Sequence, residues 1–255
     1  MTTEPSFKDH FSSQAAAYRS YRPDYPPLLF AWLAAQCPRH QAAWDCGCGN
    51  GQAALGLTPH FATVYASDPS TAQVAEAIPH PAVHYSVASA EDSHLPAAAI
   101  DLVVVAQALH WFDFERFYAE VRRVTRPGGV LAAFSYGEVQ LGPAFDPIID
   151  HFYHDVVGPY WPPERRHVDA GYRSIPFPFA EITAPFLELQ ADWDLDHLLG
   201  YLGTWSALRG FRRATGDDPL PNLRQSLVQQ WGDPAQCRPV RWPLALRVGR
   251  VGGEP

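Results

Sequence analysis

Residues 44–51 read WDCGCGNG, and this glycine-rich stretch decides the fold class. The apolar residues 42–45 are typical of a short strand, and residues 52–57 can begin a helix. Glycines at such a junction let the backbone turn sharply and approach a ligand, while the first N–H groups of the helix remain able to donate. The stretch therefore predicts a strand, a loop and a helix that together bind a nucleotide-like molecule.

The segments that follow residue 57 alternate between strand and helix signals. Residues 100–106, IDLVVVA, are nearly all apolar, which is typical of a strand covered on both faces. Further strands are expected at 63–67, 83–88 and 130–134, with helices at 70–78 and 114–124. This rhythm indicates βαβ units. It predicts an α/β fold with a Rossmann-like, doubly wound, seven-stranded and mostly parallel sheet.

We expect four regions along the chain. Residues 1–27 form an N-terminal lid segment, and residues 28–135 form the Rossmann-like core. Residues 136–184 are rich in proline and aromatic side chains that need burial, which predicts a helical cap insertion. Residues 185–255 complete the same domain with strands and helices, including one helix at 195–213, a second at 222–231 and a strand at 240–248.

The composition narrows the kinds of partner. The net charge of −8 on 255 residues disfavours binding to nucleic acid, so we expect a small-molecule substrate. No apolar run approaches the roughly 18 residues of a membrane helix, and residues 1–20 lack a secretory pattern. The four cysteines have no zinc spacing, so no metal is expected. We expect a cytoplasmic monomer or homodimer.

The glycine loop alone fits two kinds of ligand. The nicotinamide-binding pattern is GxGxxG, whereas the third glycine here comes one residue early, which makes an NAD-linked oxidoreductase the weaker alternative. Asp68 ends the next strand, 23 residues after Asp45. A carboxylate in that place can accept both hydroxyl groups of a ribose. The alternative for Asp68 is an N-cap of the helix at 70–78.

Five motifs in order resemble the class I methyltransferases that depend on S-adenosylmethionine (SAM). They are DCGCGNG, ASDPS, VASAED, DLVVVAQALHWFD and RPGGVLAAF, and the match spans residues 8–135. The leader FSSQAAAYRSYRPDYP and the later GYLGTWSALRGF are similar to the branch related to trans-aconitate methyltransferase. The resemblance implies SAM as the cofactor, with Gly47 and Gly49 under its amino-acid end and Asp45 facing the ammonium group. Asp68 would hold the ribose.

The same resemblance implies contacts along the rest of the cofactor. Residues 90–91 would frame the adenine, residues 107–108 would border the methionine chain, and the leader would fold over the molecule. The alternative interpretation of Glu91 is a solvated surface residue. For Tyr18 and Arg22 the alternative is a surface lid that does not contact the ligand. The expected cofactor-binding residues are Phe11, Tyr18, Arg22, Asp45, Gly47, Gly49, Asp68, Pro69, Ala90, Glu91, Gln107 and Ala108.

The acceptor side has fewer signals. His110 lies just past the fourth strand, where open α/β sheets place ligands, and it is the candidate general base; the alternative is a structural histidine or one against the adenosine. Trp111 is a candidate pocket wall or a core residue. Tyr201, Trp205 and Arg209 share one face of the expected helix and are candidate substrate contacts, with core packing as the alternative.

The sequence as a whole predicts a SAM-dependent methyltransferase acting on a small-molecule acceptor. A carboxylic acid is the candidate acceptor, for which Arg22 and Arg209 are candidate anion clamps. One alternative is a SAM-binding module of the same fold without turnover. Methylation of RNA or protein is disfavoured by the acidic charge and the expected lid.

Overall fold

The computed structural model describes residues 21–252. Seven strands form a continuous path in the order β3-β2-β1-β4-β5-β8-β6, and β7 pairs with the other end of β8. The first five strands pair in parallel, whereas β8 runs antiparallel to its three partners. The strands are β1 (Ala42–Cys46), β2 (Thr63–Asp68), β3 (Val83–Val87), β4 (Ile100–Ala106), β5 (Thr125–Tyr136), β6 (Ala180–Ile182), β7 (Glu188–Trp193) and β8 (Arg238–Arg250). This mixed sheet confirms the Rossmann-like α/β fold.

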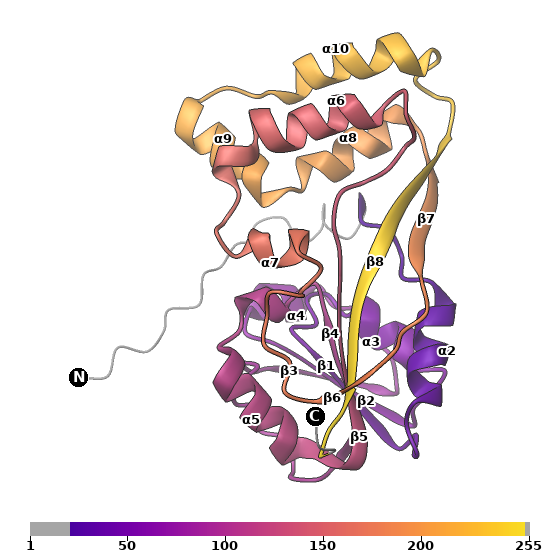
Figure 1. Cartoon of the computed structure of the whole chain (residues 1–255), viewed down its shortest axis with the longest axis vertical. Coiled ribbons are helices and arrows are strands. Elements are labelled where there is room, and N and C mark those ends of the chain that lie inside the picture. Colours follow the sequence, from indigo (N-terminus) through magenta and orange to yellow (C-terminus); the bar gives the residue numbers. More distant parts are fainter. Residues whose placement is uncertain (1–20, 253–255) are drawn as a thin grey trace, which may run out of the picture.

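Helices cover both faces of the sheet at one end of the molecule and gather above it at the other (Figure 1). The helices around the sheet are α2 (Pro27–Ala35), α3 (Gln52–Leu57), α4 (Thr71–Ala75), η2 (Leu109–Trp111) and α5 (Phe114–Val124). Those beyond β5 are α6 (Asp146–His151), η3 (Phe152–Val156), η4 (Gly158–Tyr160), α7 (Arg165–Asp169), α8 (Leu195–Gly203), α9 (Ser206–Thr215) and α10 (Leu220–Trp231).

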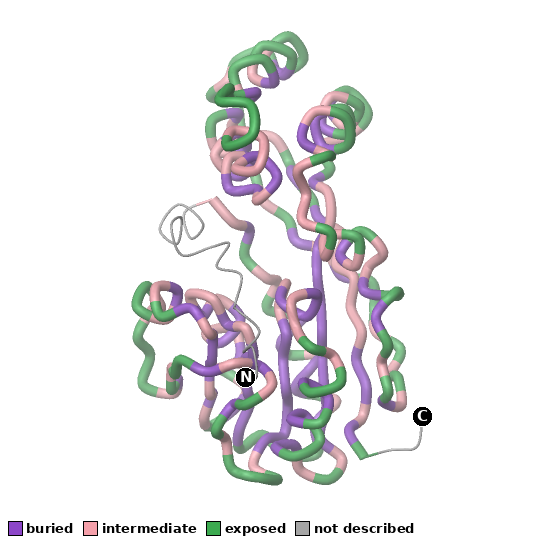
Figure 2. Tube along the Cα trace, turned by 90° about the vertical axis from the view of Figure 1, so that its left-hand side faces the viewer, coloured by how far each residue is buried: buried purple, intermediate pink, exposed green. Residues whose placement is uncertain are grey.

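Strand β4 shows why the sheet is covered on both sides. Leu102 and Val104 pack with α2 and α3 on one face, while Val103 and Val105 pack with α5 on the other. Each of these four side chains is fully buried. The tube in Figure 2 accordingly runs purple through the middle of the sheet, whereas green lies on the outer turns of the helices, on loops and on parts of the outer strands.

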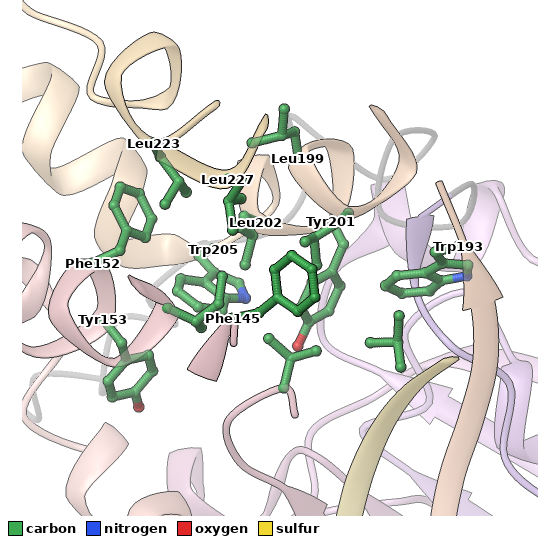
Figure 3. Packing of buried hydrophobic residues seen from close by; sticks show 14 of the residues in the cluster. Phe145, Phe152, Tyr153, Trp193, Leu199, Tyr201, Leu202, Trp205, Leu223 and Leu227 are labelled. Carbon is green, nitrogen blue, oxygen red and sulfur yellow. The ribbon is translucent and has the colours of Figure 1, made fainter. Parts of the chain in front are cut away.

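The helices above the sheet share one apolar cluster with the ends of β7 and β8. Phe145 and Phe152 from the segment after β5 pack there with Trp205, Leu223 and Trp231 from α8 to α10 (Figure 3). Strand β8 links this layer to the sheet, because residues 244–250 pair with β5 and residues 238–243 pair with β7. One long strand therefore fixes how the upper helices stand over the sheet.

Two expected helices differ from the structure, and one short strand, β6, was not expected. The single helix expected at 195–213 is wrong, because Thr204 and Trp205 separate α8 from α9, and Trp205 has an extended backbone with φ −68° and ψ 135°. The Thr204 hydroxyl donates to the Tyr201 carbonyl at 2.6 Å, which competes with the helical ladder. The helix expected at 70–78 is shorter, and the short strand β6 gives too few residues for an alternating pattern.

Candidate active site

A cavity of about 770 Å³ opens at the carboxyl ends of β1, β2 and β4. In an open α/β sheet this is the edge where ligands bind. Nine residues expected at the site line this larger cavity: Gly47, Gly49, Asp68, Pro69, Ala90, Glu91, Gln107, Ala108 and Trp111. The topology therefore gathers the ends of four separate sequence motifs around one hollow.

The glycine loop is shaped by its contacts with neighbouring strands. The backbone N–H groups of Gly47 and Cys48 donate to the Ser67 carbonyl at 2.8 and 3.0 Å, so the end of β2 holds the loop. Gly47 has φ +70°, and a Cβ there would lie 2.6 Å from the Cβ of Ala108. Only glycine fits this left-handed position without displacing the cavity wall.

Asp68 ties the loop to β2 and faces the larger cavity. Its Oδ2 accepts from the Gly49 N–H at 2.9 Å, and its Oδ1 accepts from the Ser70 N–H at 2.8 Å. The N-cap of α4 is Ser70, whose hydroxyl accepts from the Gln73 N–H, so the capping role does not fall to Asp68. Asp68 also lines the larger cavity, which places its carboxylate beside any ligand bound there.

Asp45 lies beneath the larger cavity and does not line it. The side chain is 0% exposed, and among residues 21–252 no donor reaches either carboxylate oxygen with hydrogen-bond geometry. Burial raises the pKa of Asp45 to about 7, and the nearby Ala54 N–H opposes the shift without forming a bond. The expected role of Asp45, facing a ligand ammonium directly or through water, stays a prediction, and the structure places its carboxylate behind the residues that line the cavity.

We expect Asp45→Asn to stabilise the ligand-free protein at pH 8 by about 2–4 kcal/mol. The folded-state pKa lies above the unfolded value near 3.8, so the unfolded chain binds fewer protons between these two values. The contribution of protonated Asp45 to the free energy of unfolding is therefore complete below pH 4, and it is lost as pH rises toward 7. Urea unfolding at pH 4.5 and pH 8 checks this; an equal effect of the substitution at both values contradicts the assignment.

Glu91 contacts the start of α5 rather than standing free in solvent. Its Oε1 accepts from the Asp113 N–H at 3.0 Å, and Asp113 in turn caps α5 by accepting from the Arg116 N–H at 3.2 Å. Ala90 is buried beside it in the cavity wall. These contacts fix one side of the larger cavity through the N-terminus of α5.

Gln107 adopts a backbone conformation that is rare for a side-chain-bearing residue. Its φ is +56°, its N–H donates to the Phe134 carbonyl, and its Nε2 donates to the Tyr136 carbonyl, both at 2.9 Å. Left-handed non-glycine residues cost about 1–3 kcal/mol and concentrate at functional sites. The two bonds to β5 hold Gln107 at the mouth of the larger cavity.

A second, smaller cavity of about 50 Å³ adjoins the first. Gln107 and Trp111 line both cavities, so the two hollows meet at these side chains. The lining residues come from the leader, from the end of β4, from the segment before α7 and from the turn between α8 and α9: Arg22, Gln107, His110, Trp111, Trp161, Pro162, Arg165, Trp205 and Ser206.

The smaller cavity is positively charged within an acidic protein. Arg22 donates from Nη1 to the Tyr136 hydroxyl at 3.1 Å and lies over the Tyr201 ring at 5.2 Å. Arg165 enters from the opposite wall, at the start of α7. None of the described residues that line this cavity is acidic. Two guanidinium groups in one small aromatic cavity favour an anionic ligand.

His110 is a buried, neutral imidazole. It is 9% exposed, and its Nδ1 lies 3.1 Å from the Tyr172 hydroxyl. Burial, together with the charges of Arg165 and His167, lowers the pKa of His110 to about 3. An imidazole with such a pKa accepts a proton weakly at neutral pH.

Of the remaining residues expected to contact the acceptor, two line the smaller cavity and two do not. Trp111 and Trp205 line the smaller cavity, whereas Tyr201 is 1% exposed, accepts from the Trp242 indole at 3.1 Å and lines neither cavity. Arg209 lines neither, because the break before α9 removes the shared face. Phe11 and Tyr18 lie outside the described residues.

Sequence reasoning missed Arg165, Trp161, Pro162 and Ser206 as cavity residues. The run YWPPERR at 160–166, with aromatic, proline and arginine residues together, was the available signal.

The chain is similar in sequence and in fold to known proteins. Residues 44–133 match the family model described as a methyltransferase domain. A Dictyostelium discoideum relative named "Putative methyltransferase" is 32% identical over 233 residues, which cover 90% of this chain and 89% of the relative. A solved structure described as a "Putative Type II Methyltransferase" from Anaeromyxobacter dehalogenans is 51% identical, covers 91% of this chain and 98% of its own, and superposes with a TM-score of 0.86.

A more distant solved methyltransferase from Anabaena variabilis shares the fold, with 16% identity and a TM-score of 0.53. With the glycine loop, Asp68 and the larger cavity in one place, these matches define the class: the chain belongs to the class I SAM-dependent methyltransferases. Within residues 21–252, every helix is too short or too polar to cross a bilayer.

Proposed function

We propose that the protein transfers a methyl group from SAM to a small carboxylic acid held in the smaller cavity. The observation that carries the proposal is the junction at Gln107 and Trp111, where a cavity suited to SAM meets a cavity with two guanidinium groups. Similarity of the leader and of residues 200–211 to the trans-aconitate methyltransferase branch supports the same acceptor class.

The residues of the larger cavity fit SAM. The missing Cβ of Gly47 lets the loop backbone pack directly against Ala108 in the cavity wall, where the amino-acid end of the molecule would pass. Asp68 would accept the ribose hydroxyls, and Pro69, Ala90 and the start of α5 would flank the adenine. Bound there, SAM supplies a methyl group on a sulfonium, which is an activated leaving group.

The chain's own contribution is positioning and exclusion of water. Arg22 and Arg165 would hold the acceptor carboxylate, while Trp111, Trp161 and Trp205 surround it with apolar surface. Held this way, a carboxylate oxygen of the acceptor would be in place to take the methyl group in line, with the neutral thioether of the demethylated product as the leaving group. No proton is transferred, because the acceptor carboxyl group is already ionised at neutral pH.

We therefore expect His110→Asn to lower kcat/KM by less than about tenfold, whereas loss of a general base costs about 10²–10⁴-fold. The free energy of unfolding changes as well. Because the unfolded chain protonates His110 near pH 6.5 and the folded chain does so near 3, the wild type loses stability as pH falls through this window. Urea unfolding at pH 7 and pH 5 should show that the variant loses less free energy of unfolding over this pH range than the wild type does. In the kinetic assay, a loss of activity above 100-fold would contradict the conclusion that His110 is not a general base.

The proposal is tested by calorimetry with S-adenosylhomocysteine (SAH), the demethylated product, followed by labelled SAM with pooled small acids, amines and phenols. We expect SAH to bind and label to enter the acid pool. Label in amines or phenols alone overturns the acceptor class. Binding of SAH without any labelled product favours the alternative of a SAM-binding module without turnover.

A further inference from the structure

Arg165 is anchored so that its terminal nitrogens remain available to the smaller cavity. Its Nε donates to the Tyr153 hydroxyl at 2.7 Å and to Asp169 Oδ1 at 3.0 Å. Its guanidinium carbon lies 4.6 Å from the centre of the Trp161 ring. Among the described residues, neither Nη1 nor Nη2 of Arg165 takes part in a hydrogen bond to another side chain or carbonyl. The fork of the guanidinium is therefore fixed at its base and open at its tip.

The anchor itself depends on an irregular helix. Tyr153 lies in the π-helical turn η3, where the Val157 N–H donates to the Phe152 carbonyl across five residues at 3.0 Å. Such turns are rare and are frequent at functional sites. Here the turn places the Tyr153 hydroxyl where it accepts from Arg165 and donates to Asp169 Oδ1 at 2.7 Å. The three side chains form one connected network beside the cavity.

The charge of Arg165 is felt inside the cavity. It lowers the pKa of His110, which lies on the opposing wall after β4. Arg22, the other cation of the lining, already donates to Tyr136 and lies over Tyr201. Arg165 thus has the more open fork, and a planar fork pairs with a carboxylate through two parallel bonds.

We propose that Arg165 makes the site specific for an anionic acceptor by binding its carboxylate through two parallel hydrogen bonds. Tyr153 and Asp169 are positioning residues that orient the Arg165 guanidinium. This inference rests on the proposed function, since it assigns a specificity-determining residue to the same site. Asp169 contacts Arg165 through Nε alone, so the donors on the two terminal nitrogens are not used by this ion pair.

The test measures binding of benzoate and of succinate by tryptophan fluorescence, because Trp111, Trp161 and Trp205 line the cavity. Each carboxylate is paired with its neutral amide, benzamide or succinamide, and the protein is saturated with SAH. We expect the wild type to bind at least one carboxylate tenfold or more tighter than its amide. Arg165→Gln should abolish this preference, and Arg165→Lys should restore part of it.

The matched control is Arg166→Gln, because Arg166 is exposed on the same helix and lines neither cavity. It should keep the full preference. Tyr153→Phe should reduce the preference about threefold to tenfold while leaving amide binding unchanged, which a general loss of packing would not do.

Two results overturn the inference: a wild type that binds both carboxylates no better than their amides, or an Arg165→Gln variant that keeps the preference. Affinity for SAH is measured in every variant and should match the wild type, which shows that the fold persists. Failure of SAH to bind the wild type overturns the proposed function instead, so the two failures are distinguishable.

Discussion

Gly47→Ala is expected to raise the SAH dissociation constant about 100-fold and to destabilise the protein by about 2–5 kcal/mol. Two costs add at this position. An alanine at φ +70° occupies the left-handed region, and its Cβ would lie 2.6 Å from Ala108 Cβ and 3.1 Å from Phe112 Cζ. To relieve this clash, either the wall of the larger cavity or the glycine loop has to move. Either movement removes the surface that the ligand would contact.

The matched control for Gly47 is Gly49→Ala in the same loop. Gly49 is also left-handed, with φ +53°, but a Cβ there meets only Gln73 Oε1 at 3.7 Å, an ordinary contact distance. This variant should lose only about 1–2 kcal/mol of the free energy of unfolding, which is the cost of an alanine in the left-handed backbone region. Urea unfolding and calorimetry with SAH measure both effects. Equal losses in the two variants would show that backbone strain, and not the clash with Ala108, governs the loop.

Asp68→Asn is expected to weaken SAH binding by about 100-fold or more. A charge-assisted hydrogen bond contributes roughly 1.5–3 kcal/mol, and Asp68 is positioned to make two of them to a ribose. The amide also disturbs the protein, because one of its two ends is a donor that would face the N–H of either Gly49 or Ser70. The loss of acceptor capacity therefore reaches both the ligand and the loop.

A ligand comparison separates these two effects of Asp68→Asn. Calorimetry with SAH and with its 2′-deoxy analogue should show a preference for the hydroxylated ligand in the wild type and little preference in the variant. If the wild type binds both ligands equally well, the ribose assignment of Asp68 fails. If the variant keeps the preference, another residue of the larger cavity reads the hydroxyl group.

The predicted cofactor-binding residues rest on signals that are local in the sequence. Strand β1, the left-handed glycines and Asp68 lie within 30 residues of one another, and each has a steric or hydrogen-bonding reason that reads directly from the chain. Asp45 shows the limit of this reasoning. Its position before the loop predicts a place near the ligand ammonium, whereas only the structure shows that its side chain is fully buried in a strand whose five residues are all buried.

The acceptor side could be predicted only in part, because its residues come from distant segments. Trp111 and Trp205 were separate candidates for substrate contact and both line the smaller cavity, yet Arg165 required knowledge of how α7 packs over the end of β4. Tyr201 and Arg209 were grouped with Trp205 on a continuous helix. The Thr204 hydroxyl ends that helix, and tertiary packing then buries Tyr201 in the aromatic cluster.

The sequence by itself determined the class of the protein: alternating strands and helices, a loop that only glycine can form, and a carboxylate one strand away. These features depend on backbone sterics and on periods of two and 3.6 residues, which operate over short stretches. The tertiary structure alone decided the acceptor cavity. Long-range packing of the upper helices through β8 brings Arg22 and Arg165 to one hollow, and no local pattern encodes a distance between residues more than 140 positions apart.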